Sequence, residues 1–185
     1  MAAARQVYCQ CKTLVLHARL GQVAAMAHED VIRWLAAHAP EVPVIIPGAS
    51  TATVAQAAVA LGVEPGRIAK TLAMRVNGAV LLLVTRGDAR LDNKKARDAL
   101  GGKPRMLDAD ETLNVTGHAV GGVCPFGLAT DVPVWIDVSL QNFATVYPAA
   151  GSRESSVEIA PQRLADLVAR GWVDACVLPP PEPDV

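Results

Sequence analysis

The segment I68-A-K-T-L-A-M-R-V-N-G-A-V-L-L-L-V-T85 predicts two strands joined by a tight turn. Asn77-Gly78 is the dipeptide favoured in two-residue type I′ turns, because both turn residues need a positive φ. Residues 68–76 and 79–85 on either side are mostly aliphatic and are bounded by turn residues, as strands are. We therefore expect a β-hairpin whose register is set by its turn.

Lys70 is the unusual residue of this hairpin. The turn places Lys70 opposite Thr85, and strand alternation puts it on one face with three large apolar side chains, Ile68, Leu72 and Met74. An ammonium on an apolar face is costly unless it has an anionic partner or faces a water-filled pocket. A functional role for Lys70 is our prediction; the alternative is a lysine whose stem packs on apolar surface while its ammonium reaches water.

The rest of the chain alternates short helices and strands. Helices are predicted from Val31 to His38, from the capping box of Thr53 and Gln56 to Gly62, from Asp92 to Gly101, from Asp110 to Gly117 and from Pro161 to Val168. Strands are predicted at 42–46, 132–136, 145–147 and 155–159, with one helical turn at 139–143. Strands outnumber helices and their spacing is irregular, which predicts an α+β fold with a mixed, barrel-like sheet.

Length and hydropathy limit the class of protein. A chain of 185 residues suffices for one domain with its own core. The longest apolar run, 79–84, is too short to span a bilayer, and the first residues lack the apolar region of a secretory signal. We expect a cytoplasmic protein with no membrane partner. Its parts are an N-terminal extension over 1–25, one domain over 26–178 and a flexible proline-rich tail over 179–185.

Cysteine usage and charge exclude further classes. The spacing of metal ligands is absent from the four cysteines, Cys9, Cys11, Cys124 and Cys176, so reduced thiols and no bound metal are expected. The sequence contains no Walker loop, zinc motif or G-x-S-x-G motif. A net charge of −1 gives no overall signal for nucleic acid, so contact with RNA requires a local basic patch or a partner.

A glycine-rich loop, G121-G-V-C-P-F-G-L128, lies about fifty residues after Lys70. Glycine lets this backbone approach a ligand closely, and Pro125 stiffens it. Its N–H groups could stabilise the negative oxygen of a carbonyl under attack, which is worth about 3–4 kcal/mol. Its carbonyl groups could instead hold an ammonium or a ribose hydroxyl, and the sequence leaves both roles open.

Together, R67-I-A-K-T-L72 and the Gly121–Pro125 motif resemble the YbaK / prolyl-tRNA-synthetase-associated family, which hydrolyses mischarged aminoacyl-tRNA. The resemblance extends from about His28 to Val173. It implies a curved mixed sheet that closes around a pocket and is flanked by helices, with Lys70 as the indispensable residue. It also implies no cofactor. The implied partners are a tRNA acceptor end carrying a small amino acid and, in addition, a synthetase.

These arguments give a set of candidate site residues. The catalytic candidates are Lys70, Gly121 and Gly122, and the substrate-binding candidates are Val123, Cys124, Pro125, Thr85, Ala150, Gly151, Ser152 and Arg153. Arg153 also fits an ordinary surface arginine. Lys94 and Lys95, on a predicted helix, fit a solvated face better than a phosphate contact.

The resemblance predicts a free-standing aminoacyl-tRNA deacylase that positions water against a polarised carbonyl. The small candidate wall residues predict a shallow pocket, closed in depth by Ile68, Leu72 and Met74, for a small amino acid. One alternative is a non-catalytic module that binds a tRNA end or an amino acid. Another is a small-ester or thioester hydrolase using Cys124 with His118, which lacks an evident third, orienting group. We expect instead that Cys124 lines the pocket and that His118 is a hydrogen-bonded histidine near a helix end.

Overall fold

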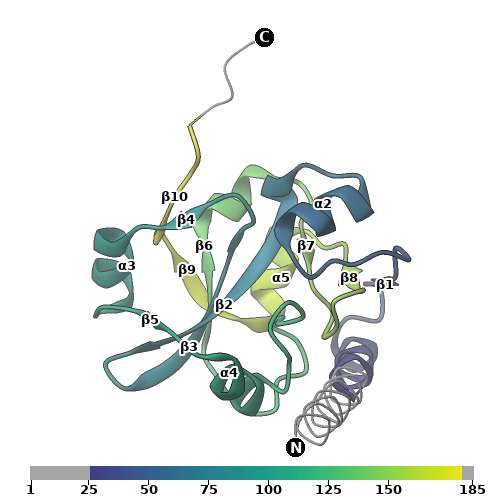
Figure 1. Cartoon of the computed structure of the whole chain (residues 1–185), viewed down its shortest axis with the longest axis horizontal. Coiled ribbons are helices and arrows are strands. Elements are labelled where there is room, and N and C mark those ends of the chain that lie inside the picture. The colour runs from purple at the N-terminus through teal and green to yellow at the C-terminus, as the bar shows by residue number, and fades with distance from the viewer. Residues whose placement is uncertain (1–25, 181–185) are drawn as a thin grey trace, which may run out of the picture.

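A computed structural model describes residues 26–180 of the chain (Figure 1). Its helices are residues 26–38, α2 (Val54–Leu61), α3 (Asn93–Leu100), α4 (Ala109–Thr116) and α5 (Pro161–Val168), with 3₁₀ turns at Pro65–Arg67 and Val138–Asn142. Its strands are β1 (Val44–Ile45), β2 (Ile68–Val76), β3 (Ala79–Arg86), β4 (Arg90–Leu91), β5 (Arg105–Met106), β6 (Val134–Asp137), β7 (Tyr147–Pro148), β8 (Ser156–Val157), β9 (Ala169–Val173) and β10 (Cys176–Val177). The expected extension over 1–25 and the end of the expected tail lie outside the described residues.

The hairpin prediction is confirmed, including its register. Strands β2 and β3 pair antiparallel, with Val76 opposite Ala79 and Lys70 opposite Thr85. Asn77 has φ 49° and Gly78 has φ 87°, the two positive values that the turn requires.

The central sheet is mixed and open. It has six strands in the order β5-β2-β3-β6-β9, and β7 also pairs with β2. The β3–β6, β6–β9 and β2–β7 pairs are parallel, whereas β2 pairs antiparallel with β3 and β5. Two small sheets, β1-β8 and β10-β4, flank it. The mixed α+β architecture agrees with the sequence prediction, but the described strands do not close into a barrel, since the path ends at β5 and at β9.

The helix ends follow their caps. Thr53 Oγ1 accepts a hydrogen bond from Gln56 N–H (3.2 Å) at the start of α2. Helices α2, α3 and α4 end at Gly62, Gly101 and Gly117, which all have the left-handed conformation that favours glycine. The predicted boundaries of these helices are therefore accurate. Strands β4, β5, β9 and β10 were missed. The first two and the last have only two residues each, and the chain passes from α5 into β9 without a turn signal.

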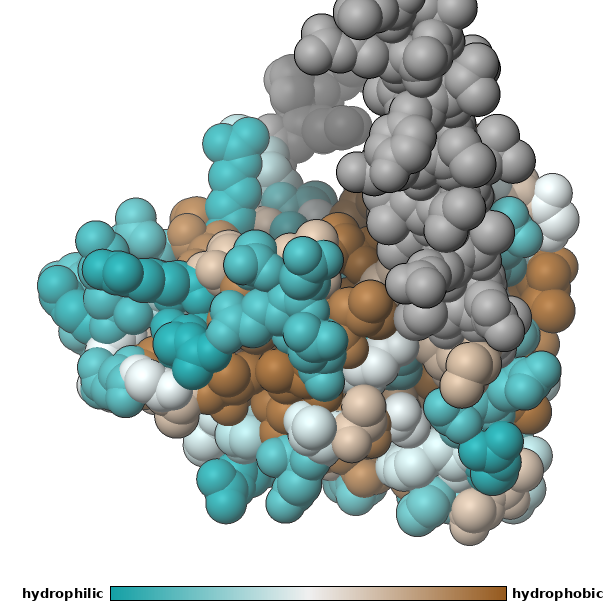
Figure 2. Space-filling model, turned by 60° about the horizontal axis from the view of Figure 1, so that its bottom comes forward, coloured by the Kyte–Doolittle hydropathy of each residue, from teal (hydrophilic) through white to brown (hydrophobic). Residues whose placement is uncertain are grey.

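Two apolar clusters cover the two faces of the sheet. The larger one joins the helix at 26–38, through Val31 and Leu35, to β3, β6 and α5. The second contains Met74, Leu83 and Cys176 and lies against α3. Figure 2 shows that hydrophilic residues gather at the left end of one face, on the side of α3 and the β2–β3 hairpin, while apolar residues lie toward its middle. Among the described residues, no helix is both long and apolar enough to span a membrane.

Candidate functional site

The candidate site lies where one edge of β2 has no strand partner. On this edge β7 pairs with Ile68 and Ala69, and β5 pairs with Met74 and Arg75. Residues 70–72 lie between these two short strands, and a cavity of about 270 Å³ opens there. Successive side chains of a strand point to opposite faces of the sheet. The cavity lies at the edge where the two faces meet, so consecutive residues of β2, namely Lys70, Thr71 and Leu72, all line it.

Three further segments complete the walls. The segment leading into α2 contributes residues 51–54, and β5 with its continuation contributes Met106 and Leu107. The glycine loop and the residue before it contribute Val120, Gly121 and Val123. Most of these side chains are small or aliphatic, and none carries a carboxylate. Among the described residues that line the cavity, Lys70 alone is charged.

The glycine loop and the loop at 151–153 are packed directly against each other. A Cβ atom on Gly122 would lie 2.9 Å from the carbonyl carbon of Ser152, so only glycine allows this approach. Arg153 Nε donates a hydrogen bond to Val120 O (2.9 Å), and Thr51 N–H donates one to Arg153 O (2.6 Å). These bonds bring Arg153 together with Val120, about thirty positions away in the chain, and with Thr51, about one hundred positions away, at one wall of the cavity.

Lys70 is half-buried, and backbone carbonyl groups accept two hydrogen bonds from its ammonium. Its Nζ donates hydrogen bonds to Gly87 O (2.9 Å) and Ala89 O (2.5 Å). Burial lowers the pKa of Lys70, while the nearby Cys176 and Asp88 oppose that shift. The two carbonyl groups hold the ammonium in place beside the cavity, and no carboxylate of the described residues lies within ion-pair distance of it.

The cavity brings together only part of the predicted set. Lys70, Gly121 and Val123 line it. Gly122, Pro125, Ala150 and Gly151 are buried behind it. Arg153 joins the two loops through its bond to Val120 O, whereas Ser152 Oγ shares a hydrogen bond with Ser155 Oγ within its own loop. Of the three apolar residues expected to limit its depth, Ile68 and Leu72 line it, whereas Met74 is fully buried elsewhere in the core.

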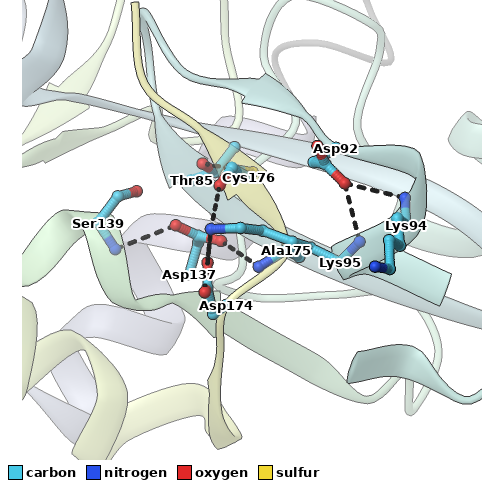
Figure 3. Close-up of polar contacts among 9 residues, drawn as sticks. All are labelled: Thr85, Asp92, Lys94, Lys95, Asp137, Ser139, Asp174, Ala175 and Cys176. Atoms are coloured by element: carbon cyan, nitrogen blue, oxygen red, sulfur yellow. Dashed lines mark hydrogen bonds and ion pairs between the residues drawn. The ribbon is translucent and has the colours of Figure 1, made fainter. Parts of the chain in front are cut away.

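Thr85 lies apart from the cavity. Its side chain is completely buried, and its Oγ1 donates a hydrogen bond to Cys176 Sγ at 3.2 Å (Figure 3). The strand that carries Cys176 is held by Asp137, which accepts a hydrogen bond from Ala175 N–H (2.9 Å). Thr85 therefore contributes to packing of the C-terminal strand and offers no surface to a substrate, contrary to the sequence-based expectation.

Cys124 and His118 form a buried, uncharged pair. Both side chains are completely inaccessible, and Cys124 Sγ lies 3.7 Å from His118 Nδ1. Burial raises the pKa of Cys124 to about 12 and lowers the pKa of His118 to about 4. A thiolate is thus absent at neutral pH, and Cys124 does not line the cavity. His118 Nδ1 accepts a hydrogen bond from Cys124 N–H (3.4 Å), but Nε2 has no partner among residues 26–180, so only half of its expected hydrogen bonding is found.

The Cys124→Ala variant is therefore expected to retain hydrolysis within about twofold of wild type, because a buried neutral thiol cannot attack a substrate. Its stability should fall by about 1 kcal/mol through the small void left behind. Measured rates and thermal melting of the purified variant test this. A loss of activity by orders of magnitude in a folded protein would restore the thiol mechanism.

Sequence reasoning missed two hydroxyl groups of the cavity. Thr51 Oγ1 and Thr71 Oγ1 are buried, line the cavity and have no hydrogen-bond partner among the described residues. Thr71 follows Lys70 directly in β2, so its position at the same edge was accessible from the strand pattern. Thr51 reaches the cavity only through the packing of α2. Buried hydroxyls without partners are costly, and a bound ligand can satisfy them.

The described residues contain no group of three or more His, Cys, Asp or Glu side chains that could hold a metal ion. The cavity wall offers the ammonium of Lys70, the backbone of the glycine loop and six hydroxyl groups, of which those of Thr51 and Thr71 are buried without a partner among the described residues. The N–H of Gly122 is engaged, since it donates to Ala119 O (2.9 Å). Gly121 and Val123, by contrast, donate to no acceptor among the described residues and lie at the cavity wall.

Comparison with known proteins places this geometry in context. The model of the aminoacyl-tRNA editing domain family matches residues 48–167. A Bacillus subtilis protein, the uncharacterized protein YwhH, is 52% identical over 129 residues, which cover 69% of this chain and 82% of that protein. An Enterococcus faecalis protein named putative Cys-tRNA(Pro)/Cys-tRNA(Cys) deacylase EbsC is 34% identical over 110 residues, 58% of this chain and 66% of its own length. The crystal structure of a putative trans-editing enzyme for prolyl-tRNA synthetase superposes with a TM-score of 0.75 at 31% identity, covering 82% of this chain and 97% of that one.

Proposed function

This chain belongs to the aminoacyl-tRNA editing domain family, and on that premise we propose that it hydrolyses the ester of a mischarged small amino acid on tRNA. The observation that carries the proposal is the cavity at the open edge of β2. Lys70, the glycine loop and two buried hydroxyl groups without a partner among the described residues, those of Thr51 and Thr71, all belong to the wall of this cavity. Editing is needed because synthetases separate amino acids that differ by one methylene by only about 1–3 kcal/mol.

The ester of aminoacyl-tRNA is already activated, so positioning a water molecule against a polarised carbonyl suffices for hydrolysis. In our proposal the N–H groups of Gly121 and Val123 stabilise the developing oxyanion, in place of the Gly122 N–H, which is engaged. Lys70 steadies the 3′-terminal adenosine and the negative charge that develops. The neighbouring ribose hydroxyl of the substrate helps to activate the water.

We assign the α-ammonium of the substrate to the hydroxyls of Thr51 and Thr71. The described residues of the cavity wall include no carboxylate to bind it, and among them these two oxygens are the buried side-chain groups that lack partners. An ammonium donor would satisfy both, which removes the cost of leaving them unpaired.

The size of the cavity predicts selectivity for small amino acids. Ala57, Ala69, Ala73 and Ala149 line it, and Leu72 limits its extent. Side chains such as those of alanine, serine, cysteine, threonine and proline should be accepted, whereas aromatic ones overpack the wall at a cost of about 1–3 kcal/mol or more. Hydrolysis rates measured with a series of mischarged tRNAs should fall as the amino acid grows. Faster cleavage of phenylalanyl-tRNA than of alanyl-tRNA would contradict this assignment.

The same series separates hydrolysis from a second candidate function. A non-catalytic module that binds a tRNA end or an amino acid would bind these substrates without turnover. Binding without any release of the amino acid above the spontaneous rate would favour that module and overturn the enzyme. The names of the similar proteins support the enzyme, since a deacylase and a trans-editing enzyme are among them.

We propose that residues 26–178 act as a single editing unit in the cytoplasm, where charged tRNA is used, with a synthetase as an additional partner. The family match covers 48–167, but the elements outside it are part of the same fold. The helix at 26–38 supplies Val31 and Leu35 to the main core, and β10 pairs with β4. Removal of either element should therefore destabilise the unit.

A further inference from the structure

We propose that the β5 edge, centred on Arg105, is the docking surface for the sugar-phosphate backbone of the tRNA acceptor end. This inference rests on the proposed function and names the residue that holds the nucleic acid at the mouth of the cavity. It follows from the position of β5, from the distribution of charge along the chain and from the pairing of two arginines across two strands.

The position of β5 connects it to the cavity. Met106 lines the cavity and keeps 57% of its surface exposed, so it lies at the rim rather than in the interior. Arg105, the residue before it, is exposed and points to the opposite face of the strand. In Figure 1, α3, β5 and α4 follow one another along one side of the molecule. A nucleic acid whose end enters the cavity past Met106 would thus pass next to Arg105.

Charge is concentrated in the segment that leads to this rim. Residues 92–105 contain five basic and two acidic side chains, a net charge of +3 in a chain whose net charge is −1. Some of these charges are already used: Asp92 caps α3, and Lys95 pairs with Asp174 (2.9 Å). Within the described part of the chain, Lys94, Lys103 and Arg105 have no ion-pair partner. An anion at the rim therefore meets uncompensated positive charge.

Arg105 also lies where it is repelled by another arginine, and a bound phosphate would reduce that repulsion. It stands directly opposite Arg75 in the β2–β5 register, and like charges in that arrangement destabilise a sheet. Glu111 on α4 pairs with Arg75, but Arg105 has no carboxylate within ion-pair distance in residues 26–180. Of the two guanidinium groups, only that of Arg75 thus has a carboxylate partner among the described residues. A phosphodiester group beside Arg105 supplies the second negative charge, in the bidentate geometry that guanidinium favours.

The test compares wild type with Arg105→Gln, and Arg163→Gln is the matched control. Arg163 lies on a different element, α5, and is exposed, but its guanidinium pairs with Glu41 (2.6 Å). Equilibrium binding of unfractionated, uncharged tRNA is measured by fluorescence anisotropy as a function of KCl concentration. Arg105→Gln should bind about tenfold more weakly, with a salt slope smaller by about one, the signature of one lost phosphate contact. Arg105→Lys should keep most of the slope, and the control should match wild type.

Kinetics separate docking from a structural role. With alanyl-tRNA, Arg105→Gln should raise KM about tenfold with kcat unchanged, and with alanyl-adenosine, which has no phosphate, it should match wild type. Its melting temperature should equal or exceed that of wild type, because the substitution removes a repulsion with Arg75. If Arg105→Gln leaves KM and the salt slope unchanged, the inference is overturned. It is also overturned if this variant has a lower melting temperature and loses equal activity on alanyl-tRNA and on alanyl-adenosine. If wild type binds tRNA through Arg105 but hydrolyses no ester, the proposed function fails and the docking surface stands.

Discussion

Replacing Lys70 with alanine is expected to lower kcat/KM for aminoacyl-tRNA hydrolysis by about 10²–10³-fold, the usual effect of removing one preorganised charge from a reacting centre. Among the described residues that line the cavity, Lys70 is the only charged one. The carbonyl groups of Gly87 and Ala89 fix its ammonium in place. No second lysine or arginine in residues 26–180 lines the cavity to replace it. Single-turnover hydrolysis of a preferred mischarged tRNA measures the loss.

The Lys70→Ala protein should remain folded. Burial lowers the pKa of Lys70, which means that the folded state disfavours the charged form. The burial of the charged ammonium therefore destabilises the folded state at neutral pH, and this destabilisation decreases only as pH rises through the lowered pKa. Removing the ammonium removes this destabilisation and does not lower stability. Lys95→Ala is the matched control, because Lys95 pairs with Asp174 outside the cavity and should keep wild-type activity.

The pH profile gives this prediction a second readout. If the charged form of Lys70 is required, kcat/KM corrected for spontaneous ester hydrolysis should fall as pH rises through the lowered pKa, below the ordinary lysine value of 10.5. The residual rate of Lys70→Ala should lack this alkaline decline. A folded Lys70→Ala protein that hydrolyses its substrate at the wild-type rate would remove Lys70 from the mechanism.

Replacing Gly122 with alanine is expected to lower kcat/KM by about 10²-fold and stability by about 1–3 kcal/mol. The new Cβ would meet the backbone of Ser152 at 2.9 Å, and backbone on both sides leaves no flexible side chain to move away. The two loops must separate, which displaces Gly121 and Val123 from the cavity wall. Rates and chemical denaturation of the variant measure the two effects.

Gly101→Ala is the control for the general cost of replacing a glycine. Gly101 caps α3 with φ 75° and has open space around its Cα, so alanine there meets backbone strain but no neighbour. The variant should lose about 1–2 kcal/mol of stability and keep the wild-type kcat. If Gly122→Ala also keeps the wild-type kcat, the close contact of the two loops is not needed for catalysis.

Local chemistry made much of this protein predictable. Asn77-Gly78 sets the hairpin and its register because the turn type demands two positive φ values, and that register places Lys70 opposite Thr85. Helix ends were predictable for the same reason, since Thr53, Gly62 and Gly101 act on backbone groups within one turn. The glycine loop was recognisable from its composition alone.

The sequence by itself therefore determined the hairpin, the helix boundaries and the candidacy of Lys70, which depend on residues close together in the chain. It also indicated the family, through two short motifs about fifty residues apart. The tertiary structure alone decided which of these residues meet. The open edge of β2 exists because β5 and β7, from distant segments, cover only its ends. Burial of Cys124 and the bond between Thr85 and Cys176, 91 positions apart, likewise depend on long-range packing. Strand alternation fixes the face of a side chain, but only the assembled fold fixes what lies opposite that face.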